Sequence, residues 1–182
     1  MIVRSDMPPV KQARWRFQPD YIANSVSDID FEYLKKSGLK ACFIDLDGTV
    51  VSKATFDVAP AVTRKLQSSG LSIYIATNRP KSRELKNLKT DLAATGIIHP
   101  DGLHPKPRKA YYLKALAQYK YQPHEVIMIG DRYIQDIWGA NHAGLVTLVV
   151  HKTGGSFGWF DRSLSKLERL KTLRLSGSYR QV

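Results

Sequence analysis

The stretch ACFIDLDGTVV at residues 41–51 decides the fold class of this chain. Residues 41–46 form a short apolar run, which is typical of a strand buried on both faces of a parallel sheet. Asp45 and Asp47 stand where this strand ends. Side chains two residues apart in a strand share a face, and two converging negative charges are costly unless a cation neutralises them. The stretch therefore predicts a strand that ends in a cation site; the alternative is a turn with solvated aspartates.

Outward from this strand, short apolar runs alternate with amphipathic segments. The expected strands are residues 41–46, 71–76, 97–98, 126–129 and 145–150. The expected helices are residues 28–37, 60–69, 81–94, 109–119 and 134–143. Such alternation predicts helices on both faces of a parallel sheet. We expect an α/β protein with a three-layer, Rossmann-like fold and a central parallel sheet of about five strands.

Three segments differ in composition. Residues 1–26 form an expected basic and aromatic arm, whose first part is discouraged from regular structure by three prolines. Residues 27–151 form the expected core, in which Ser27 caps the first helix. Residues 152–182 are basic, and leucines recur every three residues from 164 to 173. This spacing predicts a closing helix with one apolar stripe, packed on the core.

The charge balance favours an anionic partner. Lys and Arg number 28 against 16 Asp and Glu, a net charge of +12, which suits nucleic acid, anionic lipid or a phosphorylated substrate. Cys42 is the single cysteine, so a disulfide framework and a Cys-rich zinc site are excluded. No apolar run approaches the ~18 residues of a membrane span, and no secretory signal is evident. We expect a cytoplasmic protein, dissolved or attached to a surface.

Further polar residues follow the other predicted strands. Thr77 and Asn78 come after residues 71–76, where a hydroxyl can bind an anion or cap a helix. Lys106 stands between two prolines, either as a cation held at a fixed point or as a solvated loop lysine. Asp131 ends the fourth strand and Asp136 opens the next helix. In an open α/β sheet the carboxyl ends of the strands meet at one edge, so these groups are expected in one pocket. Clustered carboxylates suit Mg²⁺.

The polar residues at the strand ends form four groups along the chain: Asp45 and Asp47, Thr77 and Asn78, Lys106, and Asp131 and Asp136. In this order they resemble the four motifs of the haloacid dehalogenase (HAD) phosphatase superfamily, whose first motif is Asp-x-Asp-x-Thr. The resemblance implies a HAD-like fold in which Asp45 is the nucleophile and Asp47 the general acid and base. It also implies Mg²⁺ held by the side chains of Asp45 and Asp131 and the backbone carbonyl of Asp47, with Asp136 as a second acidic position that binds directly or through water. The residues implied in phosphate binding are Gly48, Thr77, Asn78 and Lys106.

Within the superfamily, the chain resembles the YqeG-type class III branch (HAD-IIIA), which includes phosphatidylglycerophosphate phosphatases. The matching segments are FQPD at 17–20, HPKP at 104–107, GDR at 130–132 and DIWGAN at 136–141. Gly48 departs from the branch, which more usually has Asn there. Residues 49–72 and 79–105 leave no room for a sizeable cap domain, and an open site suits polymers, proteins or a membrane surface.

The resemblance implies a Mg²⁺-dependent phosphomonoester hydrolase that works through an aspartyl phosphate and converts phosphatidylglycerophosphate to phosphatidylglycerol at the membrane surface. Basic and aromatic residues at 11–17 and aromatic residues at 155–160 suit peripheral contact with the inner face of the membrane, unless Trp15 and Phe17 pack on the domain. The alternatives are a capless phosphatase acting on nucleic acid ends, a phosphoprotein or a small phosphorylated metabolite, or a catalytically inactive binding module.

Overall fold

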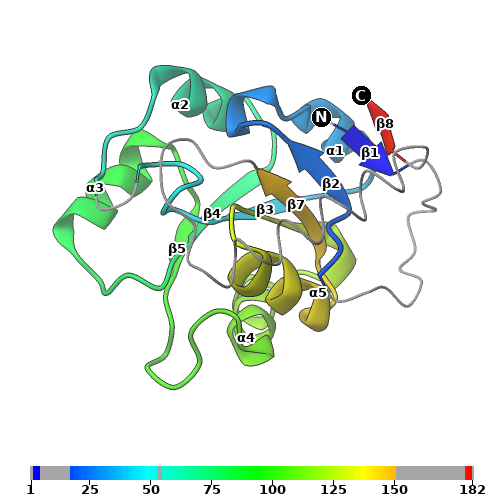
Figure 1. Ribbon diagram of the computed structural model, residues 1–182. Coiled ribbons are helices and arrows are strands. Elements are labelled where there is room, and N and C mark those ends of the chain that lie inside the picture. The colour runs from blue at the N-terminus through cyan, green and yellow to red at the C-terminus, as the bar shows by residue number, and fades with distance from the viewer. Residues whose placement is uncertain (1, 5–16, 53–54, 151–178, 182) are drawn as a thin grey trace.

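The computed structural model describes residues 2–4, 17–52, 55–150 and 179–181, and these residues contribute eight strands to one sheet (Figure 1). The order of the strands across the sheet is β5-β4-β3-β6-β7-β2-β1-β8. Their bounds are β1 Ile2–Arg4, β2 Tyr21–Ala23, β3 Ala41–Ile44, β4 Ser72–Ala76, β5 Gly96–Ile98, β6 Val126–Gly130, β7 Val146–Val150 and β8 Tyr179–Gln181.

The six strands from β5 to β2 are parallel, whereas β1 is antiparallel to β2 and β8 is antiparallel to β1. All five predicted strands are confirmed as β3 to β7. β2 lies within the expected arm and is an addition to them. The expectation that the first residues lack regular structure is wrong for Ile2–Arg4. Neither β1 nor β2 contains a proline, so neither strand lacks a backbone donor for its hydrogen-bond ladder.

Helices cover both faces of the sheet, as expected for a three-layer α/β fold (Figure 1). α1, α2 and α3 pack on one face, and α4 and α5 pack on the other. Their bounds are α1 Phe31–Lys36, α2 Pro60–Gln67, α3 Arg83–Asp91, α4 Lys109–Tyr119 and α5 Gly139–Ala143. Between β3 and β4, and between β4 and β6, the described chain holds core elements, so the expectation of no sizeable cap is confirmed.

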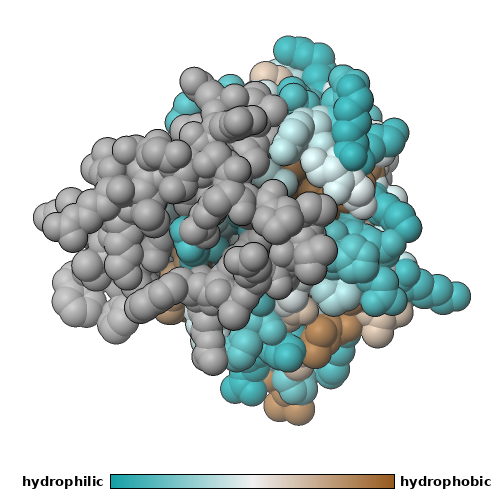
Figure 2. Space-filling view, turned by 90° about the vertical axis from the view of Figure 1, so that its right-hand side faces the viewer, coloured by the Kyte–Doolittle hydropathy of each residue, from teal (hydrophilic) through white to brown (hydrophobic). Residues whose placement is uncertain are grey.

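The surface of the described chain is mostly polar on the face shown in Figure 2, with small apolar patches near its lower edge. Among the described residues, every helix is too short or too polar to cross a membrane. The predicted closing helix lies outside the described residues. Within segment 152–182, the structure describes only β8.

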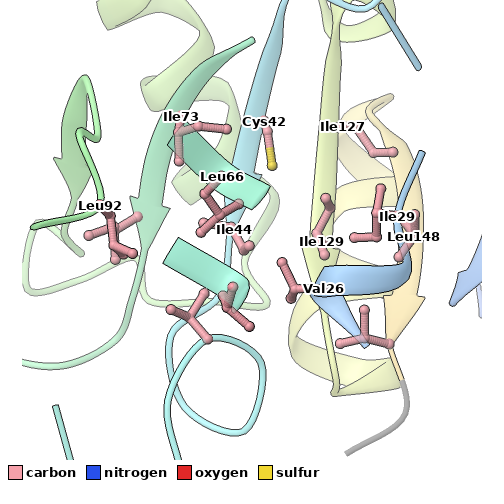
Figure 3. Packing of buried hydrophobic residues seen from close by; sticks show 14 of the residues in the cluster. Val26, Ile29, Cys42, Ile44, Leu66, Ile73, Leu92, Ile127, Ile129 and Leu148 are labelled. Carbon is pink, nitrogen blue, oxygen red and sulfur yellow. The ribbon is translucent and has the colours of Figure 1, made fainter. Parts of the chain in front are cut away.

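The apolar core divides into two layers because side chains alternate along each buried strand. In β3, Cys42 and Ile44 contribute to the cluster under α1, α2 and α3 (Figure 3), whereas Ala41 and Phe43 contribute to the cluster under α4 and α5. Strands that are buried on both faces carry continuous apolar runs. Burial also raises the pKa of the Cys42 thiol, which fits a core residue.

The first helix begins later than the sequence suggested. The chain makes one 3₁₀ turn, η1 Val26–Asp28, and is extended at Ile29 before α1. Asp30 then caps α1, because its side chain accepts a hydrogen bond of 2.9 Å from the backbone N–H of Tyr33. The predicted cap at Ser27 is therefore wrong. The end of the helix is as expected, since Gly38 follows it with φ +92°.

β2 is fastened to β7 by a buried aspartate. The Asp20 carboxylate accepts hydrogen bonds from the backbone N–H of Thr147 at 2.8 Å and from its hydroxyl at 3.3 Å. The backbone N–H of Asp20 donates to the Thr147 carbonyl at 2.9 Å. Buried polar groups are tolerated when they are hydrogen-bonded in this way. The contact extends the parallel sheet by one strand beyond β7.

A substitution in α1 tests the packing of this layer. Leu34 is fully buried, so Leu34→Ala is expected to lower the free energy of unfolding by about 2–5 kcal/mol, measured by urea denaturation. Lys36→Ala on the same helix removes only an exposed ion pair with Glu32 and should cost less than about 1 kcal/mol. Similar costs for the two variants would contradict the described packing.

Candidate active site

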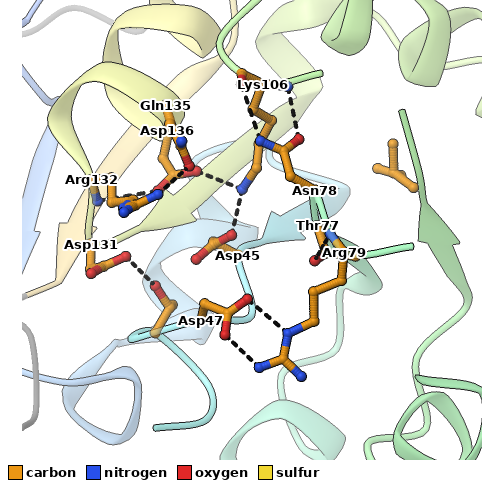
Figure 4. Close-up of polar contacts among 12 residues, drawn as sticks. Asp45, Asp47, Thr77, Asn78, Arg79, Lys106, Asp131, Arg132, Gln135 and Asp136 are labelled. Atoms are coloured by element: carbon orange, nitrogen blue, oxygen red, sulfur yellow. Dashed lines mark hydrogen bonds and ion pairs between the residues drawn. The ribbon is translucent and has the colours of Figure 1, made fainter. Parts of the chain in front are cut away.

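The predicted site residues converge at the edge of the sheet where the parallel strands end (Figure 4). Asp45 follows β3, Thr77 follows β4, and Asp131 follows β6. Lys106 comes from the loop between β5 and α4. Since β3 lies between β4 and β6 in the sheet, Asp45 stands at the centre of the group. This placement follows from the parallel topology alone.

Three buried carboxylates form the centre of the site. One carboxylate oxygen each from Asp45, Asp131 and Asp136 lie within 4.8 Å of one another. Asp45 is 6% exposed, and the other two are at most 1% exposed. Such a set of hard oxygen donors fits Mg²⁺, which is commonly bound by carboxylates together with substrate phosphate. The expectation that distant acidic residues meet at one point is confirmed.

Lys106 supplies the positive charge that this group needs. Its Nζ donates to Asp45 Oδ1 at 2.5 Å and to Asp136 Oδ1 at 2.7 Å. Burial alone would lower the pKa of Lys106, but the two carboxylates outweigh burial and raise that pKa well above its usual value. Burial raises the pKa of Asp45 to about 7, with Asp136 adding to the rise and Lys106 opposing it. A divalent cation among the carboxylates would also favour their charged form.

Asn78 holds Lys106 in place. The Asn78 Oδ1 accepts from the Lys106 backbone N–H at 2.9 Å, and the Asn78 Nδ2 donates to the Lys106 carbonyl at 3.1 Å. The sequence suggested that Asn78 binds phosphate, but its amide is engaged by the backbone of the lysine loop. Its side chain therefore fixes the Lys106 backbone to the loop that follows β4.

The turn after β6 places Asp136 beside Lys106. Residues Tyr133–Trp138 form a π-helix, η3, that continues directly into α5. The Asp136 Oδ2 accepts a hydrogen bond of 3.2 Å from the backbone N–H of Arg132. A Cβ at Gly130 would lie 2.4 Å from the Asp136 carboxyl, so any larger residue would displace this side chain. Gly130 is thus needed for the close approach of Asp136 to the strand.

Thr49 and Thr77 lie in the inner part of the site. The Thr49 hydroxyl is 3.5 Å from Asp131 Oδ1, at the limit of a hydrogen bond. Thr77 is 1% exposed, and its Oγ1 accepts a 3.0 Å hydrogen bond from the Arg79 backbone N–H. A hydroxyl can accept one hydrogen bond and still donate its own proton, so the Thr77 hydroxyl can also donate to a ligand oxygen.

Gly48 has a turn-forming role. It has φ +86°, and its backbone N–H donates to the Val51 carbonyl at 2.8 Å. The sequence suggested that Gly48 contacts phosphate, but its amide is engaged within this turn. The positive φ explains why glycine stands here, since other residues rarely adopt it.

Asp47 lies apart from the three buried carboxylates and pairs with Arg79, a residue that the sequence analysis missed. Arg79 Nε donates to Asp47 Oδ2 at 2.9 Å, and Arg79 Nη2 donates to Asp47 Oδ1 at 2.5 Å (Figure 4). The Asp47 side chain is 36% exposed, in contrast to the buried group. The one available signal was the position of Arg79 directly after the Thr77-Asn78 pair at the end of β4.

The fold and the site together define an α/β enzyme whose chemistry rests on buried carboxylates. Residues 52–144 match the model of the family described as haloacid dehalogenase-like hydrolase. The chain belongs to this family and is a hydrolase. The match includes Thr77, Lys106 and the two late aspartates, and it begins shortly after Asp47.

Two relatives with curated names are similar to this chain. The "Probable phosphatase YqeG" of Bacillus subtilis (strain 168) is 25% identical over 166 residues, which cover 88% of this chain and 94% of that protein. The "Phosphatidylglycerophosphate phosphatase 1, chloroplastic" of Chlamydomonas reinhardtii is 25% identical over 154 residues. That match covers 77% of this chain but 56% of the relative, so this chain spans little more than half of its length.

A solved structure supports the fold. The crystal structure of an uncharacterized protein from Listeria monocytogenes serotype 4b superposes with a TM-score of 0.50 and 19% identity. The superposition covers 66% of this chain and 85% of that one. At this identity the likeness shows the shared α/β architecture.

The donor set predicts stabilisation by Mg²⁺. A ligand that binds only the folded state adds about 2.7 kcal/mol at one hundred times its Kd, so Mg²⁺ should raise the melting temperature and EDTA should reverse the rise. Asp131→Asn is expected to reduce that rise sharply while leaving the metal-free protein folded, because it removes one buried charge. An unchanged Mg²⁺ response of Asp131→Asn would argue against the site.

The close contact at Gly130 gives a second prediction. Gly130→Ala is expected to weaken Mg²⁺ binding by at least about tenfold, because the new methyl group displaces Asp136, as measured by isothermal titration calorimetry. Ile127→Val in the same strand removes one core methylene, costing about 0.5–1.5 kcal/mol of stability, and should leave Mg²⁺ affinity unchanged. Equal affinities of Gly130→Ala and the wild type would contradict the described geometry.

Proposed function

We propose that this HAD-family phosphatase hydrolyses phosphomonoesters through an aspartyl phosphate on Asp45, with Mg²⁺ as cofactor, and that its substrate is the anionic lipid phosphatidylglycerophosphate. The observation that carries the reaction is the position of Asp45 at the centre of the site. Its carboxylate lies between Lys106 and two further buried carboxylates. This arrangement suits a nucleophile that must approach a charged phosphoryl group.

In the first step, a carboxylate oxygen of Asp45 forms a bond to phosphorus as the bond from phosphorus to the ester oxygen breaks. Asp47 in its protonated form gives a proton to the departing oxygen. In the second step, water attacks the aspartyl phosphate and passes a proton to Asp47, which restores both carboxyl groups and releases phosphate. Lys106 and Thr77 hold the phosphoryl oxygens throughout both steps.

Asp45, Asp131 and the backbone carbonyl of Asp47 would hold Mg²⁺, with Asp136 binding directly or through water. When bound, Mg²⁺ supplies positive charge that lets the anionic phosphoryl group approach these carboxylates. The fit rests on the buried oxygen donors, which meet within 4.8 Å of one another.

The edge of the sheet that carries the site is bordered by positive charge. α3 and α4 both begin at this edge, and the exposed basic residues at their starts are Lys81, Arg83, Arg108 and Lys109. Basic residues at the start of a helix oppose its dipole, so their placement does not serve helix stability. Their placement favours a surface that binds anions. Each basic residue near an anionic leaflet contributes about 1 kcal/mol.

An apolar residue is exposed in the loop that precedes Arg108 and Lys109. Leu103 is 73% exposed in the loop between β5 and α4, the same loop that carries Lys106. The Asp101 carboxylate shapes the turn, since it accepts a 3.0 Å hydrogen bond from the His104 backbone N–H. A leucine next to basic residues suits the surface of an anionic membrane. The name of the Chlamydomonas relative supports the same lipid.

Phe17 is the one aromatic residue expected at the membrane that the described residues include. Phe17 stacks on Trp138 with ring centroids 6.2 Å apart. It therefore packs on the domain, and the expected membrane contact is wrong for this residue. Residues 11–16 and 155–160 lie outside the described residues. The proposed peripheral contact with the inner face of the membrane therefore relies on the edge that carries the site.

The nucleophile is tested by Asp45→Asn, because an amide cannot form the aspartyl phosphate. We expect phosphate release from p-nitrophenyl phosphate to fall by at least about a thousandfold, with the circular dichroism spectrum unchanged. Asp91→Asn, an exposed residue of α3, serves as the matched control and should keep full activity. Appreciable turnover by Asp45→Asn would contradict the assignment.

The wild-type enzyme is used to distinguish the candidate substrates. Phosphatidylglycerophosphate in mixed micelles should give a higher kcat/KM than a 5′-phosphorylated oligonucleotide, a phosphopeptide or a sugar phosphate. A preference for the oligonucleotide would favour the nucleic acid alternative that the net charge of +12 also permits. Complete inactivity on all four would favour a binding module.

A further inference from the structure

Arg79 contacts three neighbouring groups, and Figure 4 shows one of these contacts, the pair with Asp47. Its guanidinium makes the two hydrogen bonds to Asp47 and a third, of 3.2 Å, from Nη1 to the Thr55 carbonyl. The guanidinium carbon also lies 4.5 Å from the centre of the Phe56 ring. A planar group with several donors can satisfy these contacts at once, whereas a lysine ammonium cannot.

The backbone of Arg79 is fixed as well. Its N–H donates to Thr77 Oγ1 at 3.0 Å, and its carbonyl lies 3.2 Å from His99 Nδ1. The Arg79 side chain is 18% exposed, so an entering ligand can reach it. The residue thus joins the inner phosphate position at Thr77 to the outer segment with Thr55 and Phe56.

The pair with Asp47 conflicts with the role proposed for Asp47. A carboxyl group that donates a proton needs one oxygen that carries hydrogen and points at the leaving oxygen. Both Asp47 oxygens accept hydrogen bonds from Arg79, so the pair must open on at least one side before the proton can be passed. A guanidinium that leaves one anion is stabilised if another anion takes its place.

We propose that Arg79 is a specificity-determining residue, which binds a second anionic group of the substrate on the leaving-group side and thereby releases Asp47. The proposal rests on the proposed function. The phosphoryl group itself is held on the inner side, by Lys106 and Thr77, so the second anion belongs to the part of the substrate that departs. Phe56 and the Thr55 carbonyl retain the guanidinium while it changes partner.

The substrate class that follows is a phosphomonoester with a second anion, such as a phosphodiester, a few bonds from the ester oxygen. A lipid head group and a soluble polyol carrying two phosphates share this chemistry. The two sources are separated by using the head group without its acyl chains, so that a membrane plays no part in the measurement.

The experiment compares two soluble substrates in the presence of Mg²⁺. Glycerol 1-phosphate has no second anion, whereas glycerophosphoglycerol phosphate, the deacylated head group, carries a phosphodiester. We expect the wild type to prefer the second by at least about tenfold in kcat/KM, which corresponds to one charge-assisted contact. Arg79→Gln should reduce the preference to about twofold or less, and Arg79→Lys should give an intermediate value.

Arg64→Gln is the matched control, since Arg64 is an exposed arginine of α2 outside the basic residues that border the site, and it should keep the wild-type preference. The proposal is overturned if the wild type shows no preference, if Arg79→Gln keeps it, or if Arg79→Gln loses activity equally on both substrates, as a merely structural role would require. Phosphatidylglycerophosphate hydrolysis without any preference among soluble substrates would assign recognition to the membrane instead. Absence of Mg²⁺-dependent release from every phosphomonoester would remove the proposed function itself.

Discussion

The concentration of buried negative charge at one edge of the sheet is the constraint on which the rest of the structure depends. Three carboxylates meet within 4.8 Å, and the buried ammonium of Lys106 contacts two of them. Burying a charge without a partner costs several kcal/mol. Three carboxylates beside one ammonium favour a further cation, and Mg²⁺ fits this set of oxygen donors. A group that is costly to assemble is tolerated because function requires it.

The side chains of this group are held by the backbone and by small residues around them. Asn78 fixes the lysine loop through two hydrogen bonds to its backbone. Gly130 allows Asp136 to lie against β6, and Gly139 allows the loop at Pro107 to lie against α5, since a Cβ there would be 2.6 Å from the Pro107 carbonyl oxygen. Both glycines therefore serve close approach between elements that carry site residues.

Much of the fold could be predicted from the sequence because its central strands are apolar on both faces, and this signal is local. The strands β3 to β7 and the helix Lys109–Tyr119 follow it closely. The short strands β1, β2 and β8 depend on edge pairing between distant residues, such as the contact from Asp20 to Thr147, and no local pattern encodes that pairing. The cap at Asp30 was missed because the one-turn η1 interrupts the segment before it.

The candidate site divides in the same way. Residue types at strand ends predicted which carboxylates meet, because a parallel sheet brings those ends together. The partners of each side chain are set by the three-dimensional arrangement, so the engagement of Asn78 with Lys106 and of Arg79 with Asp47 was not encoded in any spacing. These two contacts change the interpretation of the site, since they show which polar groups are already occupied.

The difference in burial between Asp45 and Asp47 has a chemical meaning. Asp45 is 6% exposed and contacts the Lys106 ammonium, which suits its proposed role as the group that attacks an anionic phosphoryl centre. The side chain of Asp47 is 36% exposed, which suits its proposed exchange of protons with the leaving oxygen and then with water. Two aspartates separated by a single leucine thus lie in different surroundings, because the strand has already ended at Ile44 and Gly48, with φ +86°, turns the chain directly after them.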